Sequence, residues 1–382
     1  MKKRINMLRE FSVPLLAGVF AALTWANLWP ESYHHFVDNP LFGPLSFHFI
    51  TNDLFMVLFF GIAAVEITQS CLPGGDLNPP RKAVNPLLAT LGGVIGPVAV
   101  YLGLNAVIGE PALARGWGIP TATDIALAWL VARMVFGAGH PAVSFLLLLA
   151  VADDAIGLAI IAIFYPDPSL PTSPQWLFLV IVGMAVAYLL RNMKMRSYWP
   201  YLIVGGGLCW SGLYLSHLHP ALALAFVVPF LPHSRREAQH IFEDDPADRS
   251  TLATFEHEWK VFVDFGMFMF GLANAGVLFS GIGTATWLVL CSLFIGKTVG
   301  IFTMGLVGKT LGFPLPEHVG ARELLLVGIV AGLGLTVALF VAGEAFADPG
   351  VQGAAKMGAL LSGGLALLAI ILGRLFKIRR IG

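Results

Sequence analysis

The segment AVADDAIG, residues 150–157, is the most informative part of this sequence. It places two adjacent carboxylates, Asp153 and Asp154, in the middle of an apolar run from Pro141 to Tyr165. A run of that length can cross a bilayer, which takes about 20 apolar residues. A carboxylate near the bilayer centre costs roughly 2.5–3.5 kcal/mol and normally faces a partner, a cation or a water-filled cavity. The pair therefore predicts a functional site inside a membrane-embedded helix bundle; the alternative is a neutral, hydrogen-bonded pair with a structural role.

The composition of the whole chain is typical of an integral membrane protein. Of the 382 residues, 57% are hydrophobic and only 12% are charged, about half the charged share of soluble domains. The formal net charge is zero, which gives no indication of a nucleic-acid partner. Three cysteines, Cys71, Cys209 and Cys291, lack the spacing of a metal or redox motif. We expect no cofactor and no large soluble domain.

The hydrophobic pattern predicts an all-α integral membrane protein with about twelve transmembrane helices. A polar stretch at residues 233–258 is predicted to be a cytoplasmic loop between the eighth and ninth spans. The expected spans cover residues 12–29, 51–70, 86–108, 119–136, 141–165, 174–190, 198–215, 220–231, 259–279, 285–307, 323–345 and 351–372.

Basic residues concentrate in alternate loops between these spans. Under the positive-inside rule, loops rich in lysine and arginine face the cytoplasm. Both termini are therefore expected to be cytoplasmic, which agrees with an even number of spans. The residues that carry this expectation are Lys2, Lys3, Arg4, Arg9, Arg81, Lys82, Arg191, Lys194, Arg196, Arg235, Arg236, Arg249, Lys309, Arg322, Arg374, Lys377, Arg379 and Arg380.

Two of the expected spans are interrupted. The fourth contains GIPTATD, residues 118–124, where a proline removes a backbone donor shortly before Asp124. The eleventh contains GLGLT, residues 332–336. Interrupted segments at corresponding positions of two halves indicate a transporter site, although each break alone could be an ordinary kink. We expect two broken, crossed helices within inverted repeats formed by spans three to five and ten to twelve. The residues assigned to the broken backbone are Pro120, Gly332, Gly334 and Thr336.

A lysine in the tenth span, Lys297, is as costly in a membrane as the two acids. The least costly arrangement pairs it with Asp153 or Asp154, and the three groups would then titrate as a coupled set. Such a set can exchange protons for a cation. Asp124, which follows the break in span four, can offset the positive ends of the two broken helices.

Other titratable residues lie near the ends of the expected spans. Glu66 is either a membrane-border residue or part of a site, and Glu256 with His257 forms either a titrating cluster or a plain loop edge. His219 is expected to be structural. Asp264 lies just inside the ninth span, and the sequence gives it no role.

The order of these motifs resembles bacterial sodium/proton antiporters of the NhaA family. The resemblance implies an electrogenic secondary antiporter that exports Na⁺ or Li⁺ in exchange for H⁺ by alternating access. It also implies location in the bacterial inner membrane. The motifs that carry it are PTATDIA at 120–126, the Asp153–Asp154 pair, FY at 164–165, LANAG at 272–276, IGK at 295–297 and GLGLT at 332–336.

The resemblance also implies roles for individual residues. Asp154 would be the principal ligand of Na⁺, with Asp153 beside it as the partner of Lys297. Thr123 and Asp124 would lie at the crossing of the broken helices. The positions that match family residues implicated in pH regulation are Glu66, Glu256, His257 and His219.

We expect a single membrane domain over residues 1–382, with Na⁺, Li⁺, H⁺ and the lipid bilayer as partners and a possible homodimer. The expected parts are an ion-binding bundle at 86–165 and 285–372, interface helices at 12–70 and 220–279, linker helices at 174–215 and the cytoplasmic loop.

Two other functions compete with antiport. A sodium-coupled solute symporter would share the broken-helix design. An intramembrane aspartyl hydrolase would use two opposed acids, but adjacent residues on one helix point about 100° apart. We therefore expect a transporter and not an enzyme.

Overall fold

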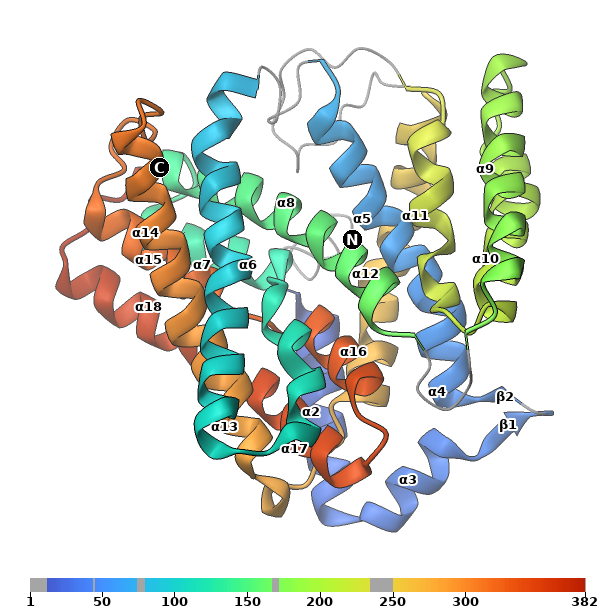
Figure 1. The fold of residues 1–382 in the computed structure, drawn as a ribbon, viewed down its shortest axis with the longest axis horizontal. Helices are drawn as coiled ribbons and strands as arrows, with labels where there is room; N and C mark the ends of the chain where they lie inside the picture. The colour runs from blue at the N-terminus through green and yellow to red at the C-terminus, as the bar shows by residue number, and fades with distance from the viewer. Residues whose placement is uncertain (1–11, 44, 74–79, 167–171, 234–249, 382) are drawn as a thin grey trace, which may run out of the picture.

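The computed structural model describes residues 12–43, 45–73, 80–166, 172–233 and 250–381. These residues form a bundle of helices, with one small antiparallel hairpin of β1 (Pro40–Phe42) and β2 (Leu45–Ser46) beside α3 and α4 (Figure 1). In chain order, with η marking 3₁₀ or π turns, the helices are α2 (Val13–Leu28), α3 (Pro30–Asp38), α4 (Phe47–Phe49), η1 (Ile50–Phe55), α5 (Met56–Cys71), α6 (Pro80–Ile108), η2 (Pro111–Thr121), α7 (Ile125–Phe136), α8 (Pro141–Phe164), η3 (Pro174–Trp176), α9 (Leu177–Asn192), η4 (Tyr201–Gly206), α10 (Gly207–Leu215), η5 (Pro220–Leu222), α11 (Ala223–Val227), η6 (Val228–Phe230), α12 (Thr251–Asn274), η7 (Phe279–Gly281), α13 (Thr284–Cys291), η8 (Ser292–Gly296), α14 (Lys297–Thr310), α15 (Ala321–Ala331), α16 (Thr336–Ala345), α17 (Pro349–Leu361) and α18 (Gly364–Leu375).

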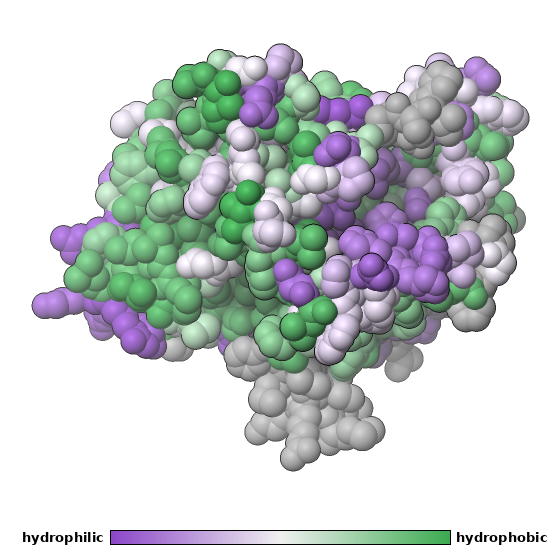
Figure 2. Space-filling model, turned by 90° about the horizontal axis from the view of Figure 1, so that it is seen from below, coloured by the Kyte–Doolittle hydropathy of each residue, from purple (hydrophilic) through white to green (hydrophobic). Residues whose placement is uncertain are grey.

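Several of these helices are long and apolar enough to cross a membrane. Within the described residues there are 6 of them, or up to 8 if each of two bent pairs forms one span. Many large apolar side chains point outward, for example Val107 with 86% of its surface exposed and Phe20 with 73%. Figure 2 shows broad hydrophobic areas on one face of the molecule, next to a patch of hydrophilic residues. Such a surface suits lipid contact rather than water.

The loop predicted at residues 233–258 ends earlier than expected. Helix α12 begins at Thr251, where the Ser250 hydroxyl accepts a hydrogen bond from the Ala253 N–H and caps the helix. Glu256, His257 and Glu258 therefore lie on a helix and not in a loop, because the cap starts the helix before the apolar run does. Residues 234–249 of the expected loop lie outside the described residues.

Two helix pairs are bent at short non-helical links. The axes of η2 and α7 differ by 58° across residues 122–124, and those of α15 and α16 differ by 49° across residues 332–335. These links coincide with the interruptions noted in the sequence. In Figure 1, α16 lies near the middle of the molecule, below α8.

Helices α6 and α14 are in backbone contact. A Cβ added at Gly92 would lie 2.1 Å from the Gly300 carbonyl oxygen, and one at Gly96 would lie 2.2 Å from the Gly296 carbonyl oxygen. Small residues four positions apart are the usual means by which membrane helices approach this closely. The contact fixes the start of α14, and Lys297 is the first residue of that helix. A π-helical turn, η8, directly precedes it, as π turns often do at functional positions.

Candidate functional site

The two non-helical links run against each other. The Asp124 N–H donates a hydrogen bond to the Leu333 carbonyl oxygen at 2.7 Å, which joins one link to the other. At Gly334 the second link passes close to the first link and to Leu293. A Cβ added there would lie 3.3 Å from the Ala122 carbonyl oxygen and 2.8 Å from the Leu293 side chain. Backbone groups freed from the helices are therefore partly satisfied by the opposite link, as a buried break requires.

Asp124 connects the first turns of two helices. Its Oδ1 accepts a hydrogen bond from the Leu127 N–H at 3.0 Å, which caps α7, and its Oδ2 accepts one from the Thr336 N–H at 3.3 Å, where α16 begins. The N-terminus of each helix carries partial positive charge. Asp124, only 3% exposed, thus lies between the positive ends of both helices.

The buried ion pair of the site joins α8 to α14. The Lys297 Nζ lies 2.6 Å from Asp153 Oδ2 and donates a second hydrogen bond, also of 2.6 Å, to the Thr121 carbonyl oxygen at the end of η2. Both side chains are 0% exposed. The residues alone left Lys297 a choice between two acids, and the structure selects Asp153.

Thr123 links this ion pair to the second broken helix. Its hydroxyl lies 2.8 Å from Asp153 Oδ2 and 2.9 Å from the carbonyl oxygen of Ala331. Ala331 is the last residue of α15. A hydroxyl has one proton to donate, so it serves one of the two acceptors at a time.

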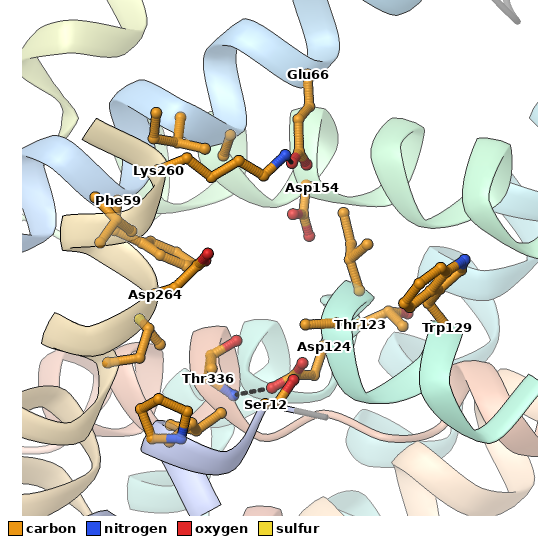
Figure 3. A pocket seen from close by; sticks show the side chains of 18 residues that line it. Ser12, Phe59, Glu66, Thr123, Asp124, Trp129, Asp154, Lys260, Asp264 and Thr336 are labelled. Carbon is orange, nitrogen blue, oxygen red and sulfur yellow. Dashed lines mark hydrogen bonds and ion pairs between the residues drawn. The ribbon is translucent and has the colours of Figure 1, made fainter. Parts of the chain in front are cut away.

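Asp154, the neighbour of Asp153, points into a cavity of about 430 Å³ (Figure 3). Among the described residues, its buried Oδ1 has no hydrogen-bond partner, and neither has Asp153 Oδ1. Thr123, Asp124 and Thr336 line the same cavity. The other lining residues are Ser12, Pro14, Leu15, Phe59, Ile62, Ala63, Glu66, Ile125, Ala126, Trp129, Lys260, Val263, Asp264 and Met267.

The residues expected to act in pH regulation separate into three places. Glu66 lines the cavity, and Glu256 is bound to it through Lys260, whose Nζ lies 3.5 Å from Glu66 Oε1 and 3.1 Å from Glu256 Oε1. His257 is exposed and does not line the cavity. His219 is remote from this cluster and contacts the end of α8.

His219 belongs to a second hydrogen-bonded group. Its Nε2 is hydrogen-bonded to the Tyr165 carbonyl oxygen, and its Nδ1 lies 3.5 Å from Glu344 Oε2 on α16. The Tyr165 hydroxyl accepts a hydrogen bond from the Gly118 N–H and donates one to the Arg115 carbonyl oxygen. This group therefore ties η2, α8 and α16 together at one end of the site.

Some residues of the site were missed in the sequence. The Ser362 hydroxyl accepts a hydrogen bond from the Gly334 N–H at 3.2 Å and so supports the second link. Lys260 and the glycines at the α6–α14 contact were also missed. Two signals could have found them: the four-residue spacing of Gly92, Gly96, Gly296 and Gly300, and the matching spacing of Glu256, Lys260 and Asp264.

Comparison with known proteins gives a consistent result over the whole chain. The family model described as Na⁺/H⁺ antiporter 1 matches residues 5–376. The Na⁺/H⁺ antiporter NhaA of Geobacter sulfurreducens is 74% identical over 381 residues, which covers 100% of both chains. That of Jannaschia sp. is 43% identical over 416 aligned positions and covers 98% of each.

A solved structure supports the fold. The sodium proton antiporter MjNhaP1 from Methanocaldococcus jannaschii superimposes with a TM-score of 0.56, at 16% identity, over 96% of this chain and 92% of the other. At that identity the likeness concerns the fold alone. Together with the family match and the apolar helices, these findings show that the chain is a multi-pass membrane protein and belongs to the Na⁺/H⁺ antiporter NhaA family.

Proposed function

We propose that this chain exports Na⁺ or Li⁺ in exchange for H⁺ at the paired aspartates, in the inner membrane of a bacterium. Its membership of the antiporter family supports the exchange of Na⁺ for H⁺. The observation that carries the assignment of the site is the placement of Asp154. Its carboxylate lines a cavity while its neighbour Asp153 is held by Lys297.

In this proposal Na⁺ and H⁺ compete for the same carboxylates. A proton on Asp154 neutralises the group that a cation would bind, and a bound cation disfavours that proton. Asp153, Asp154 and Lys297 titrate as a coupled set because their charges lie within one small buried volume. If two protons leave this set for each Na⁺ that enters, one net charge crosses the membrane in each cycle, and the exchange is electrogenic.

The broken helices provide the moving part of the proposal. We assign η2–α7 and α15–α16 as the crossed helices of two inverted repeats, within about twelve spans. One repeat contains α6, η2–α7 and α8, and the other contains α13–α14, α15–α16 and α17–α18. These form the ion-binding bundle, and alternating access arises when this bundle rocks against the interface helices around residues 12–70 and 220–279.

The proposal includes an orientation and an assembly. Both termini lie in the cytoplasm in this proposal, which the basic residues of alternate loops support. Glu66 and Glu256, tied together by Lys260, are assigned to pH regulation with His257 and His219. The chain functions in the lipid bilayer, either alone or as a homodimer, and needs no cofactor.

Everted membrane vesicles test this function. After respiration acidifies the vesicles, added Na⁺ should collapse the pH gradient in the wild type, and Asp154→Asn should lose this response because its amide cannot ionise. Asp348→Asn is the matched control, since Asp348 is exposed and caps α17 away from the cavity. No response in the wild type, or a full response in Asp154→Asn at equal protein level, would reject the proposal.

A further inference from the structure

One face of α12 carries an acid, a base and an acid at four-residue intervals, Glu256, Lys260 and Asp264. Residues four apart lie on the same side of a helix. The Lys260 ammonium contacts Glu256 on its own helix and Glu66 on α5. The side chains of Lys260, Glu66 and Glu256 are 15%, 12% and 10% exposed. The Glu256 carboxylate is held further by the Gln69 amide, which donates to Oε2 at 2.6 Å.

Lys260 differs in charge from the other ionisable groups of the cavity. The lining residues identified in the described part of the chain include four acids, Glu66, Asp124, Asp154 and Asp264, and one base, Lys260. In Figure 3 the Lys260 ammonium lies beside the Glu66 carboxylate, with Asp154 next in line and Asp264 on the neighbouring wall. The cavity therefore contains a fixed positive charge close to the acid assigned to Na⁺.

We propose that Lys260 sets the affinity with which the cavity takes up Na⁺. A fixed ammonium neutralises Glu66 and repels a second cation, so it weakens the attraction that the remaining carboxylates exert on Na⁺. Lys260 is a positioning residue in this account, because it acts through Glu66 and through the field at Asp154. The inference rests on the proposed function, in which Na⁺ reaches Asp154 through this cavity.

The weakened affinity has a use in transport. A cavity with four carboxylates and no base would bind a cation strongly, and a strongly bound ion leaves slowly. An ammonium held on α5 and α12 lowers the affinity without occupying Asp154. A purely mechanical tie between these helices would not need ions, since well-packed apolar residues often stabilise a buried contact as well as an ion pair does.

The test separates apparent affinity from maximal rate in everted vesicles at alkaline pH. Lys260→Gln removes the charge and should lower the KM for Na⁺ by about threefold to tenfold, because one charge in a partly hydrated site changes the energy of a nearby cation only moderately. Lys260→Arg keeps the charge and should keep the wild-type KM. Lys309→Gln is the matched control because Lys309 is exposed, outside the cavity lining, and its KM should not change.

A second variant tests the opposite direction. Asp264→Asn removes a negative charge from the same wall and should raise the KM by a similar factor. Added salt of an untransported cation should reduce both differences, because ions in the cavity screen the charges. A structural role for Lys260 predicts instead a lower protein level and a lower maximal rate without these shifts in KM.

An unchanged KM in Lys260→Gln, or an equal shift in Lys260→Arg, would overturn the inference. If Lys260→Gln does not fold, an unchanged KM in Asp264→Asn would overturn it in the same way. Failure of the proposed function is distinguishable, because it would appear as absent Na⁺-driven proton release in the wild type. The affinity inference fails only where the wild type exchanges ions and the charge variants keep its KM.

Discussion

The two sides of the broken-helix crossing differ in polarity and in access. On one side, Asp154 faces a cavity lined by ionisable groups. On the other side, about one turn along α16 from Thr336, the Phe340 ring packs on Phe60 at 5.4 Å and on His219 at 5.8 Å between ring centroids. Phe60 and Phe340 are 1% and 2% exposed. The crossing is therefore bordered by a cavity at Asp154 and by packed rings at Phe340. In the alternating access proposed above, these would be the open and the closed side of the site.

The largest expected effect concerns the buried ion pair between Lys297 and Asp153. Lys297→Met leaves Asp153 buried without its counter-ion and should lower the free energy of unfolding by about 3–5 kcal/mol. The double variant Lys297→Met/Asp153→Leu removes both charges and should recover most of that loss. Thermal unfolding in detergent measures both, with Lys309→Met as an exposed control. A double variant no more stable than the single one would contradict the explanation by an unpaired charge.

The closed side should depend on one aromatic ring. Phe340→Ala removes a fully buried side chain that contacts both Phe60 and His219, and should cost about 3 kcal/mol. The same melting assay measures the loss, and Phe340→Leu, which refills much of the volume, should recover part of it. An unchanged melting temperature in Phe340→Ala would show that these rings do not pack as described.

Access to the two sides can be compared directly by thiol labelling. In a background without Cys71, Cys209 and Cys291, a cysteine introduced by Ala126→Cys should react at least about tenfold faster than one introduced by Ala342→Cys. Ala126 is an exposed residue of the cavity lining, whereas Ala342 is 0% exposed. A tenfold ratio corresponds to about 1.4 kcal/mol. Equal rates with a water-soluble reagent would remove the distinction between an open and a closed side.

The smallest expected effect concerns the second link. Ser362→Ala removes the hydroxyl that accepts from the Gly334 N–H and should cost about 1 kcal/mol. Thr310→Ala, which removes an exposed hydroxyl bonded only within its own helix, is the control and should have less effect. If both variants melt alike, the link at Gly334 does not depend on Ser362.

Features encoded in short stretches were predicted well from the sequence. The expected span at 141–165 agrees with α8, Pro141–Phe164, because an uninterrupted apolar run and an N-terminal proline define it. The backbone breaks near Asp124 and Gly334 follow from local residue types. The predicted loop at 233–258 extended too far, because α12 already begins at Thr251. Capping by Ser250 is a weaker signal in a sequence than hydropathy.

Features that depend on contacts between distant helices were predicted only in part. The residues alone left Lys297 with two possible partners, since the choice depends on how α8 is rotated about its axis. The position of Lys260 beside Glu66 requires α5 and α12 to be neighbours. The sequence of either helix alone does not indicate this contact. For the same reason His257 and Glu256, adjacent in sequence, were grouped together although one side chain is exposed and the other buried.

The glycine contact between α6 and α14 limits which motions the protein can make. The backbone of each helix fits against the glycines of the other, where side chains are missing. If one helix slid along the other by a fraction of a turn, its carbonyl oxygens would clash with neighbouring side chains. The two helices should consequently travel as one rigid strut during a transport cycle. Lys297, at the start of α14, would then keep its position relative to α6 whichever side of the membrane the site faces.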